Sequence, residues 1–345
     1  MIGITMGDPH GVGPELVLKA WKAGELEGAG AQAAGSGGPP APHPGVVVVG
    51  DLSVLEYCSE RLGYKVPLHP VADPGAARPG SLNVIDLRAI ARGELAPGSL
   101  SAAAGRAARA YIEKAVRLAL DGSLDAVVTL PVNKGAVRLT DPAFTGHTEM
   151  IAELCGAKRV AMMLASERLA VTHVSTHVSL AEAILRVKRE RILEVILLTH
   201  EALARFIPEP RIAVAGLNPH AGEHGSFGRE EIEEISPAIA AARERGLILT
   251  GPEAPDTVFV RAVKGAFDGV VCMYHDQGHI PAKLLDFEGG VNITLGLPIV
   301  RTSVDHGTAF DIAYKGVATT KSLVAAYRYA IRLAGSTPAN GGSTA

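Results

Sequence analysis

Three histidines each follow an apolar run of the kind that forms a buried strand: His177, His220 and His275. A single histidine behind a strand is typically a hydrogen-bonded loop residue. Three of them favour another interpretation, because catalytic zinc takes three protein ligands and keeps one position open. No HExxH pattern occurs, so a zinc protease of that type is not indicated. The spacing alone leaves a metal site and structural histidines as alternatives.

Cationic and amide side chains that could hold an anionic substrate occur later in the chain. Lys283 follows the third histidine by eight residues, and Asn292 and Arg301 bracket the segment 292–301. Arginine binds phosphate through two parallel hydrogen bonds, and lysine acts as a point charge. An arginine at the end of an apolar segment is more often solvated or paired with a surface carboxylate. Both interpretations of Arg301 therefore stay open here.

The segment 6–15, MGDPHGVGPE, is a glycine-rich connection between an expected strand and an expected helix. It lacks the G-x-G-x-x-G pattern, since Leu16 stands where the third glycine should be, and it lacks the Gly-Lys-Ser/Thr end of a P-loop. We therefore predict either a tight turn or a ligand loop, without a Rossmann or Walker motif.

Alternating apolar runs and helical patterns must position these residues. Continuous apolar runs, typical of buried parallel strands, occur at 46–49, 125–130, 160–165, 169–174, 211–217 and 268–273. Helical patterns occupy 101–120, 180–206, 229–245 and 321–333. Strand–helix alternation predicts an α/β fold with a mostly parallel sheet covered on both faces. Its working loops should lie at the carboxyl ends of the strands.

Composition excludes several classes of protein. The chain of 345 residues is 47% hydrophobic and 20% charged, which is typical of a globular α/β protein of one or two domains. A net charge of −3 gives no basic field for nucleic acid or membrane surfaces. Three dispersed cysteines, no signal peptide pattern and no long apolar run predict a cytoplasmic protein. We expect residues 28–44 to form an inserted flexible surface loop and residues 335–345 to be a disordered tail.

Eight ordered motifs together resemble one family. GDPHGVGPE, PVNKGAV, FTGHTE, STHVSL, GLNPHAGEHG, MYHDQGH, GVNITLGLP and RTSVDHGTAFDIA are similar to the 4-hydroxythreonine-4-phosphate dehydrogenases of vitamin B6 synthesis, the PdxA family. The resemblance runs from about residue 4 to about residue 333. It implies a fold of the isocitrate/isopropylmalate dehydrogenase type, with two α/β domains and an interdomain cleft. We place the cofactor-side domain at 1–130 plus 303–345 and the metal, substrate and dimer domain at 131–302.

The resemblance also implies site residues. The metal ligands would be His177, His220 and His275, with the third ligand supplied by the partner subunit of an obligate homodimer. Substrate contacts would come from His147, Thr148, Lys283, Asn292 and Arg301. NAD or NADP would be held near His306 and Gly307. Lys283, Asp276 and Asp256 are candidates for moving a proton, and Asp276 could instead orient or neutralise the metal site.

The implied reaction is NAD(P)-dependent oxidation of the C3 hydroxyl of 4-phosphooxy-L-threonine. The 2-amino-3-oxo-4-phosphooxybutanoate formed then loses CO₂ to give 3-amino-2-oxopropyl phosphate. The divalent metal would be zinc, cobalt, magnesium or manganese.

Other functions remain as alternatives. STHVSL and residues 278–285 look more like paralogues that oxidise 4-phospho-D-threonate or 4-phospho-D-erythronate, whereas FTGHTE and NITLGLP look more like the B6 branch. His279 is the residue that marks this choice. More remote alternatives are a three-histidine metal-dependent hydrolase and a binding protein with structural histidines.

Overall fold

The computed structural model describes residues 1–26 and 45–335, so the expected loop at 28–44 and the tail beyond 335 lie outside the described residues. The chain divides into two compact units. Unit 1 comprises Met1–Lys158 and Leu297–Ala334, and unit 2 comprises Arg159–Gly296. Residues 131–158 and 297–302, which the predicted boundaries assign to the second domain, belong to unit 1.

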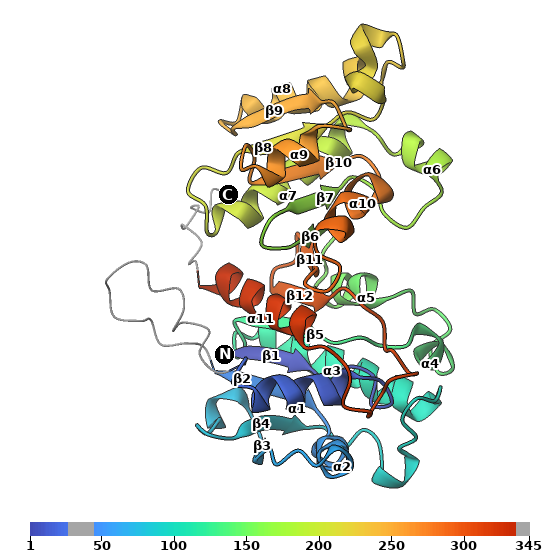
Figure 1. The fold of residues 1–345 in the computed structure, drawn as a ribbon, viewed down its shortest axis with the longest axis vertical. Helices are drawn as coiled ribbons and strands as arrows, with labels where there is room; N and C mark the ends of the chain where they lie inside the picture. Colours follow the sequence, from blue (N-terminus) through green and yellow to red (C-terminus); the bar gives the residue numbers. More distant parts are fainter. Residues whose placement is uncertain (27–44, 336–345) are drawn as a thin grey trace. The chain divides into compact units, whose positions relative to one another are not determined.

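Unit 1 contains a fully parallel sheet in the order β3-β4-β2-β1-β5-β12 (Figure 1). Its strands are β1 (Ile2–Thr5), β2 (Val46–Gly50), β3 (Leu68–Val71), β4 (Leu82–Asp86), β5 (Ala126–Thr129) and β12 (Val300–Val304). In register, Ile4 pairs with Val48 and Val128, and all three are completely buried. Burial on both faces explains why these strands are apolar without alternation.

Helices surround this sheet. They are α1 (Gly13–Lys22), α2 (Leu52–Leu62), α3 (Ala102–Leu120), α4 (Lys134–Arg138), α5 (His147–Leu154), α11 (Lys321–Ala334) and the short 3₁₀ turns η1 (Pro74–Ala76) and η2 (Arg92–Glu94). The longest, α3, is preceded by Ser101, whose side chain accepts a hydrogen bond from the Ala104 amide. That contact caps one of the helix's unpaired N–H groups.

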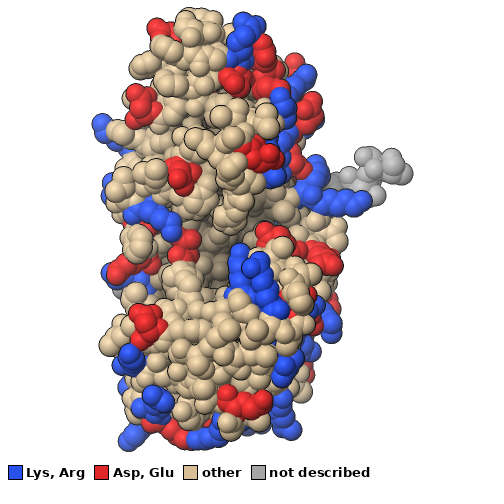
Figure 2. All heavy atoms as spheres, turned by 90° about the vertical axis from the view of Figure 1, so that its right-hand side faces the viewer, with Lys and Arg blue, Asp and Glu red and all other residues tan. Residues whose placement is uncertain are grey.

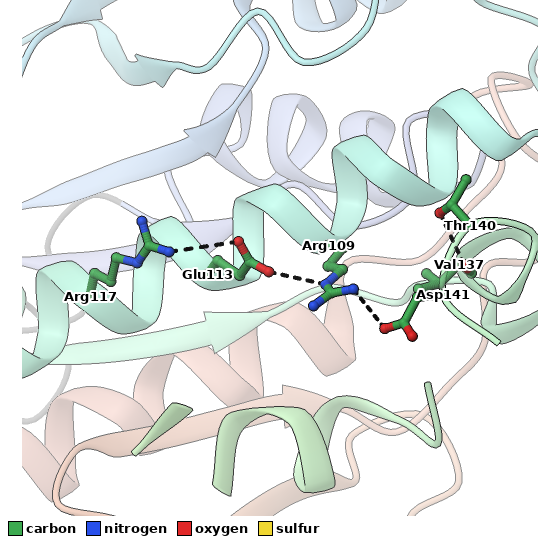
Figure 3. A network of polar contacts seen from close by, with 6 residues as sticks. All are labelled: Arg109, Glu113, Arg117, Val137, Thr140 and Asp141. Atoms are coloured by element: carbon green, nitrogen blue, oxygen red, sulfur yellow. Dashed lines mark hydrogen bonds and ion pairs between the residues drawn. The ribbon is translucent and has the colours of Figure 1, made fainter. Parts of the chain in front are cut away.

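Packing on α3 explains why residues 131–158 belong to unit 1. A Cβ at Gly105 would lie 2.3 Å from the Ala136 carbonyl oxygen, so α3 and α4 approach closely only because glycine stands there. Arg109 of α3 donates to Glu113 at 3.0 Å and to Asp141 at 2.6 Å (Figure 3). A buried apolar cluster joins α3, α4, α5, the connection between α4 and α5, and the segment before β12: Ile112, Val116, Val137, Phe144, Met150, Ile151 and Ile299.

Unit 2 has a mixed sheet in the order β11-β6-β7-β10-β8-β9. The pairs β11–β6 and β6–β7 are antiparallel, and the remaining pairs are parallel. Its strands are β6 (Ala161–Ala165), β7 (Ala170–His173), β8 (Ile212–Ala215), β9 (Leu249–Glu253), β10 (Gly269–Cys272) and β11 (Val291–Leu295). The predicted strands at 160–165, 169–174, 211–217 and 268–273 are therefore present, though 160–165 runs antiparallel to its neighbours.

The helices of unit 2 are more interrupted than the sequence pattern indicated. They are α6 (Leu180–Leu185), α7 (Arg189–Ala204), α8 (Ser236–Arg243), α9 (Val258–Val263), α10 (His275–Leu285), the 3₁₀ segment η3 (Pro219–Gly225) and the π-helical turn η4 (Glu231–Ile235). The single helix predicted at 180–206 is two helices, because the chain leaves α6 at Arg186 and becomes extended at Lys188. Among the described residues, no helix combines the length and apolar character that crossing a membrane requires.

Surface charge contributes little to the stability of either unit. Basic and acidic side chains are interspersed on the face drawn in Figure 2. Many form exposed ion pairs, such as Arg229–Glu233, with an N–O distance of 2.6 Å and side chains 65% and 57% exposed. A solvent-exposed pair contributes about 0–1 kcal/mol. The buried apolar side chains therefore supply most of the stabilisation.

Candidate active site

The MYHDQGH segment is a tight turn from a buried strand into a helix. β10 ends at Cys272, Tyr274 is extended, and His275 is the first residue of α10. Gln277 fixes this turn: its side-chain oxygen accepts from the Met273 amide at 2.7 Å, and its Nε2 donates to the Gly216 carbonyl at 2.7 Å. Because Gly216 directly follows β8, this buried amide joins the two strand ends that carry His275 and His220.

The imidazole of His275 is oriented by the next residue. Its Nδ1 lies 2.6 Å from Oδ1 of Asp276. A carboxylate only accepts hydrogen bonds, so Nδ1 carries a proton, and in the neutral ring Nε2 is then the nitrogen with the free lone pair. Carboxylates hold metal-binding histidines in this manner. The contact matches the orienting role that we considered for Asp276.

His177 and His275 come together at one pocket of unit 2. Their ring centroids are 5.7 Å apart, and both residues line a pocket of about 410 Å³. The loop that carries His177 is held by Ser175, whose hydroxyl donates to the Met273 carbonyl at 3.2 Å. The carboxyl ends of β7 and β10 thus place two of the three predicted imidazoles beside each other, as parallel strand ends should.

His220 sits in a left-handed turn. Residues 220–224 all have positive φ, between 39° and 77°. Left-handed backbone costs roughly 1–2 kcal/mol for each residue with a Cβ, so the turn needs outside support. Glu231, only 2% exposed, supplies it by accepting from the Leu217 and Asn218 amides, both at 2.7 Å.

Glu231 was not among the residues identified from the sequence. It lies in the predicted helix 229–245, where one acidic residue among several looks like part of a solvated face. The available signal in the sequence is the set of glycines before it. Gly222 is one of them, and a Cβ there would lie 2.6 Å from the Glu231 carboxylate, so only glycine leaves room for this side chain.

The metal site itself stays a prediction. In the part of the chain that the structure describes, no group of three or more His, Cys, Asp or Glu side chains is arranged to hold a metal ion. One chain brings His177 and His275 together, whereas His220 is exposed and its ring lies 6.3 Å from that of Phe227. The resemblance assigns one ligand to a second subunit, so a single chain would present only part of the set.

Arg301 belongs to the interior of unit 1. It lies on β12, is 3% exposed, and donates from Nε and Nη2 to the Thr129 hydroxyl at 3.1 and 2.7 Å. Burial lowers the pKa of the guanidinium to about 10, which still leaves it charged at neutral pH, and the charge of Glu149 partly offsets this shift. The alternative of a solvated surface arginine is therefore wrong.

His147, at the start of α5, lies within the electrostatic reach of Arg301. Burial and then the Arg301 charge lower the pKa of His147 to about 3, so the ring is neutral. The residue is partly exposed, but its Nε2 atom is buried and has no hydrogen-bond partner among the described residues. A buried polar atom without a partner costs free energy, which a bound ligand would recover. The predicted substrate residues His147 and Arg301 are thus close in one unit, and Thr148 adjoins them.

Lys134, which is not among the predicted site residues, adds a second positive charge. A Cβ at Gly146 would lie 3.2 Å from Lys134 Nζ and 2.9 Å from Glu149 Oε2. The Lys134 charge also contributes to lowering the pKa of His147. Its place in the PVNKGAV motif was the available signal. The two cations and the neutral imidazole outweigh the single carboxylate of Glu149 and favour binding of an anionic group here.

Three further predicted residues are part of unit 2. Lys283 and Asn292 belong to unit 2, where Lys283 Nζ lies 5.7 Å from the Phe287 ring centroid and Asn292 contacts Met162. Asp256 is exposed just before α9.

The glycine-rich segment 6–15 and the segment after β12 pack together in unit 1. The Val12 amide donates to the Thr308 carbonyl at 3.0 Å, and the Tyr314 hydroxyl donates to the Pro9 carbonyl at 2.7 Å. A Cβ at Gly13 would lie 2.1 Å from the Met6 carbonyl oxygen, so a tight turn is present here. The exposed residues His306 and Gly307 directly precede Thr308.

Comparison with known proteins gives a consistent assignment. The family model "Pyridoxal phosphate biosynthetic protein PdxA" matches residues 43–330. A 4-hydroxythreonine-4-phosphate dehydrogenase of Desulforapulum autotrophicum is 44% identical over 99% of this chain and 97% of its own length. A D-threonate 4-phosphate dehydrogenase of Cupriavidus necator is 47% identical over 97% of each chain.

A solved structure agrees with the fold. The crystal structure of a 4-hydroxythreonine-4-phosphate dehydrogenase from Klebsiella pneumoniae has a TM-score of 0.84 and 45% identity, over 97% of this chain and 99% of that one. The predicted α/β fold of the isocitrate/isopropylmalate dehydrogenase type is thereby confirmed. The chain belongs to the PdxA family of pyridoxal phosphate biosynthetic proteins.

Proposed function

We propose that the protein is an NAD(P)-dependent dehydrogenase that oxidises the C3 hydroxyl of 4-phosphooxy-L-threonine. The product, 2-amino-3-oxo-4-phosphooxybutanoate, would decarboxylate to 3-amino-2-oxopropyl phosphate in the synthesis of pyridoxal 5'-phosphate. The observation that carries this proposal is the family match, together with relatives named as dehydrogenases over nearly their full lengths. NAD or NADP would bind on the side of His306 and Gly307.

A divalent metal completes the proposal. The donor chemistry fits, because His177 and His275 face one pocket and the contact with Asp276 leaves Nε2 of His275 as a lone-pair donor. Zinc, cobalt, magnesium or manganese would be held by His177, His220 and His275. Bound there, the metal would polarise the substrate hydroxyl.

A homodimer that shares this site is part of the proposal. The helices beside the pocket, α6 and α10, expose large apolar side chains: Leu180 (60%), Leu185 (68%), Ile280 (56%) and Leu284 (82%). Both helices lie on the right-hand side of unit 2 in Figure 1. Exposed apolar surface of this kind is typical of a protein–protein interface. A second copy of the chain would cover it and contribute a histidine.

The chain's own residues have definable tasks. Arg301, rigid and charged, would bind an anionic group of the substrate, with Lys134 as a second cation and neutral His147 as a hydrogen-bond partner. His147, Thr148, Lys283 and Asn292 would fix the orientation of the substrate. Asp276 would hold His275. Proton transfer then falls to Lys283 or Asp256.

The runner-up substrate is 4-phospho-D-threonate or 4-phospho-D-erythronate. The specific observation in its favour is the relative from Cupriavidus necator, a D-threonate 4-phosphate dehydrogenase at 47% identity. Reduction of NAD and of NADP should be followed with each phosphorylated acid, with and without divalent metal. The proposal expects the highest kcat/KM with 4-phosphooxy-L-threonine. Faster turnover of a phosphorylated aldonate would assign the runner-up, and release of phosphate without cofactor reduction would favour a hydrolase.

A further inference from the structure

We propose that His279, supported by His173, is a positioning residue that fixes the ring of His275 for metal binding. This inference rests on the proposed metal-dependent function. It gives a physical role to the second histidine of MYHDQGH, which the proposed reaction does not use.

The first observation is a stack of two imidazoles on α10. His279 lies one helical turn after His275, and residues at this spacing share a helix face. The two ring centroids are 3.6 Å apart with an interplanar angle of 10°. His275 lines the pocket, whereas His279 is buried at 6% exposure. One face of the His275 ring is therefore covered by a flat buried group, while Asp276 holds its Nδ1 edge.

The second observation is that His279 is held from behind by His173 of β7. His279 Nδ1 lies 3.1 Å from His173 Nε2 and 3.1 Å from the His275 carbonyl oxygen. His173 is 1% exposed, and its Nδ1 lies 3.3 Å from the Met162 carbonyl oxygen. The carbonyl of Met162 can only accept, so Nδ1 of His173 carries the proton. The His275 carbonyl likewise only accepts, so Nδ1 of His279 carries the proton and Nε2 of His173 faces it as an acceptor.

The third observation is that α10 sits directly on β7 at this point. A Cβ at Gly278 would lie 2.6 Å from His173 Nε2 and 2.9 Å from Cys272 Sγ. Glycine therefore lets the helix approach closely enough for the contact between His279 and His173. The chain of contacts runs from the Met162 carbonyl through His173 and His279 to His275. These contacts fix the tautomers of the His173 and His279 rings, and they fix the plane of the His275 ring before any metal binds.

The test compares zinc affinity in full-length variants, by competition with a chromophoric chelator. His279→Ala removes the stack and should weaken zinc binding about 10- to 100-fold, as changes behind metal ligands do. His279→Asn keeps an N–H donor near the position of Nδ1 but lacks the ring, and should also weaken binding. The matched control is Val270→Ala, which removes buried volume from the same core without touching His275. It should keep the wild-type affinity even though it lowers the free energy of unfolding.

Two outcomes separate this inference from the proposed function. If the wild-type protein binds zinc and both His279 variants bind it within twofold as well, the positioning role is wrong and the metal site stands. If the wild-type protein binds no divalent metal, the proposed metal site is wrong, and this inference with it. If the variants fail to fold, ¹⁵N spectra of the wild-type imidazoles test the inference, because they show which nitrogen of His173 and of His279 carries the proton. Protonated Nδ1 atoms on both His173 and His279 support the inference, and a protonated Nε2 on His173 overturns it.

Discussion

Replacing Glu231 with alanine should destabilise unit 2 and disorder the turn that carries His220. The Glu231 carboxylate accepts from the Leu217 and Asn218 amides at 2.7 Å each and from Asn218 Nδ2 at 2.9 Å. Hydrogen bonds to a charged group contribute about 1.5–3 kcal/mol each. The Asn218 side chain also donates to Glu230 at 2.7 Å, so it keeps a partner. The two backbone contacts then give a loss of about 3–6 kcal/mol.

The strain of the turn supports the same magnitude. Four residues with a Cβ, His220, Ala221, Glu223 and His224, have positive φ. At roughly 1–2 kcal/mol each, they store about 4–8 kcal/mol. The Glu231 contacts are of similar size to this strain, so the turn should relax when they are lost.

The assay is the free energy of unfolding from urea titration followed by circular dichroism. The matched control is Glu233→Ala, two residues along, whose side chain is 57% exposed and pairs only with exposed Arg229 in the described contacts. The control should lose less than about 1 kcal/mol. If Glu231→Ala is no less stable than Glu233→Ala, the account of the left-handed turn is refuted.

Further variants test the other contacts. Arg301→Lys keeps the charge but loses the planar fork, so KM for the phosphorylated substrate should rise at least about tenfold in steady-state assays; an unchanged KM contradicts the anion-binding role. The pKa of His147 is lowered to about 3 in the folded chain. Below about pH 6.5 this imidazole is therefore protonated in the unfolded chain but stays neutral in the folded chain. Stability should therefore fall as the pH drops from about 6.5 towards 3, by at most about 1.4 kcal/mol per pH unit from this group. His147→Gln should show a shallower fall in urea titrations at several pH values, and an identical slope would count against the buried neutral ring. Gln277→Glu replaces the donor to the Gly216 carbonyl by an acceptor, which should cost about 1–3 kcal/mol in the same titrations; a fully stable variant would show that this amide does not join the two strand ends.

The sequence predicts those parts of the fold that depend on local pattern. The apolar runs locate the strands that end before His177, His220 and His275, and parallel pairing explains why two of these histidines meet. The antiparallel pair of β6 and β7 is a hairpin whose connection, residues 166–169, is too short for a parallel crossover, so the spacing of the two apolar runs could have predicted it. The pairing of β6 with β11, more than a hundred residues away, is not encoded by any local pattern.

The site residues that the sequence did not reveal were missed for a similar reason. Glu231 acts through backbone amides in a turn whose left-handed conformation is not visible in residue types. Lys134 can contribute its charge to the site because α4 and α5 both pack on α3, and this packing brings the Lys134 side chain next to Gly146. The burial of Arg301 follows from its place on β12 next to β5, whereas its sequence neighbours alone left a surface position and an anion-binding position open. In each case a tertiary contact decides the role.

The most direct test of the proposed activity is the rate of NAD(P)H formation by the purified full-length protein with 4-phosphooxy-L-threonine. The account predicts cofactor reduction that is abolished by a chelator, restored by a divalent metal and lost in His275→Ala. The absence of cofactor reduction with this acid and with both phosphorylated aldonates, in the presence of divalent metal, would contradict it.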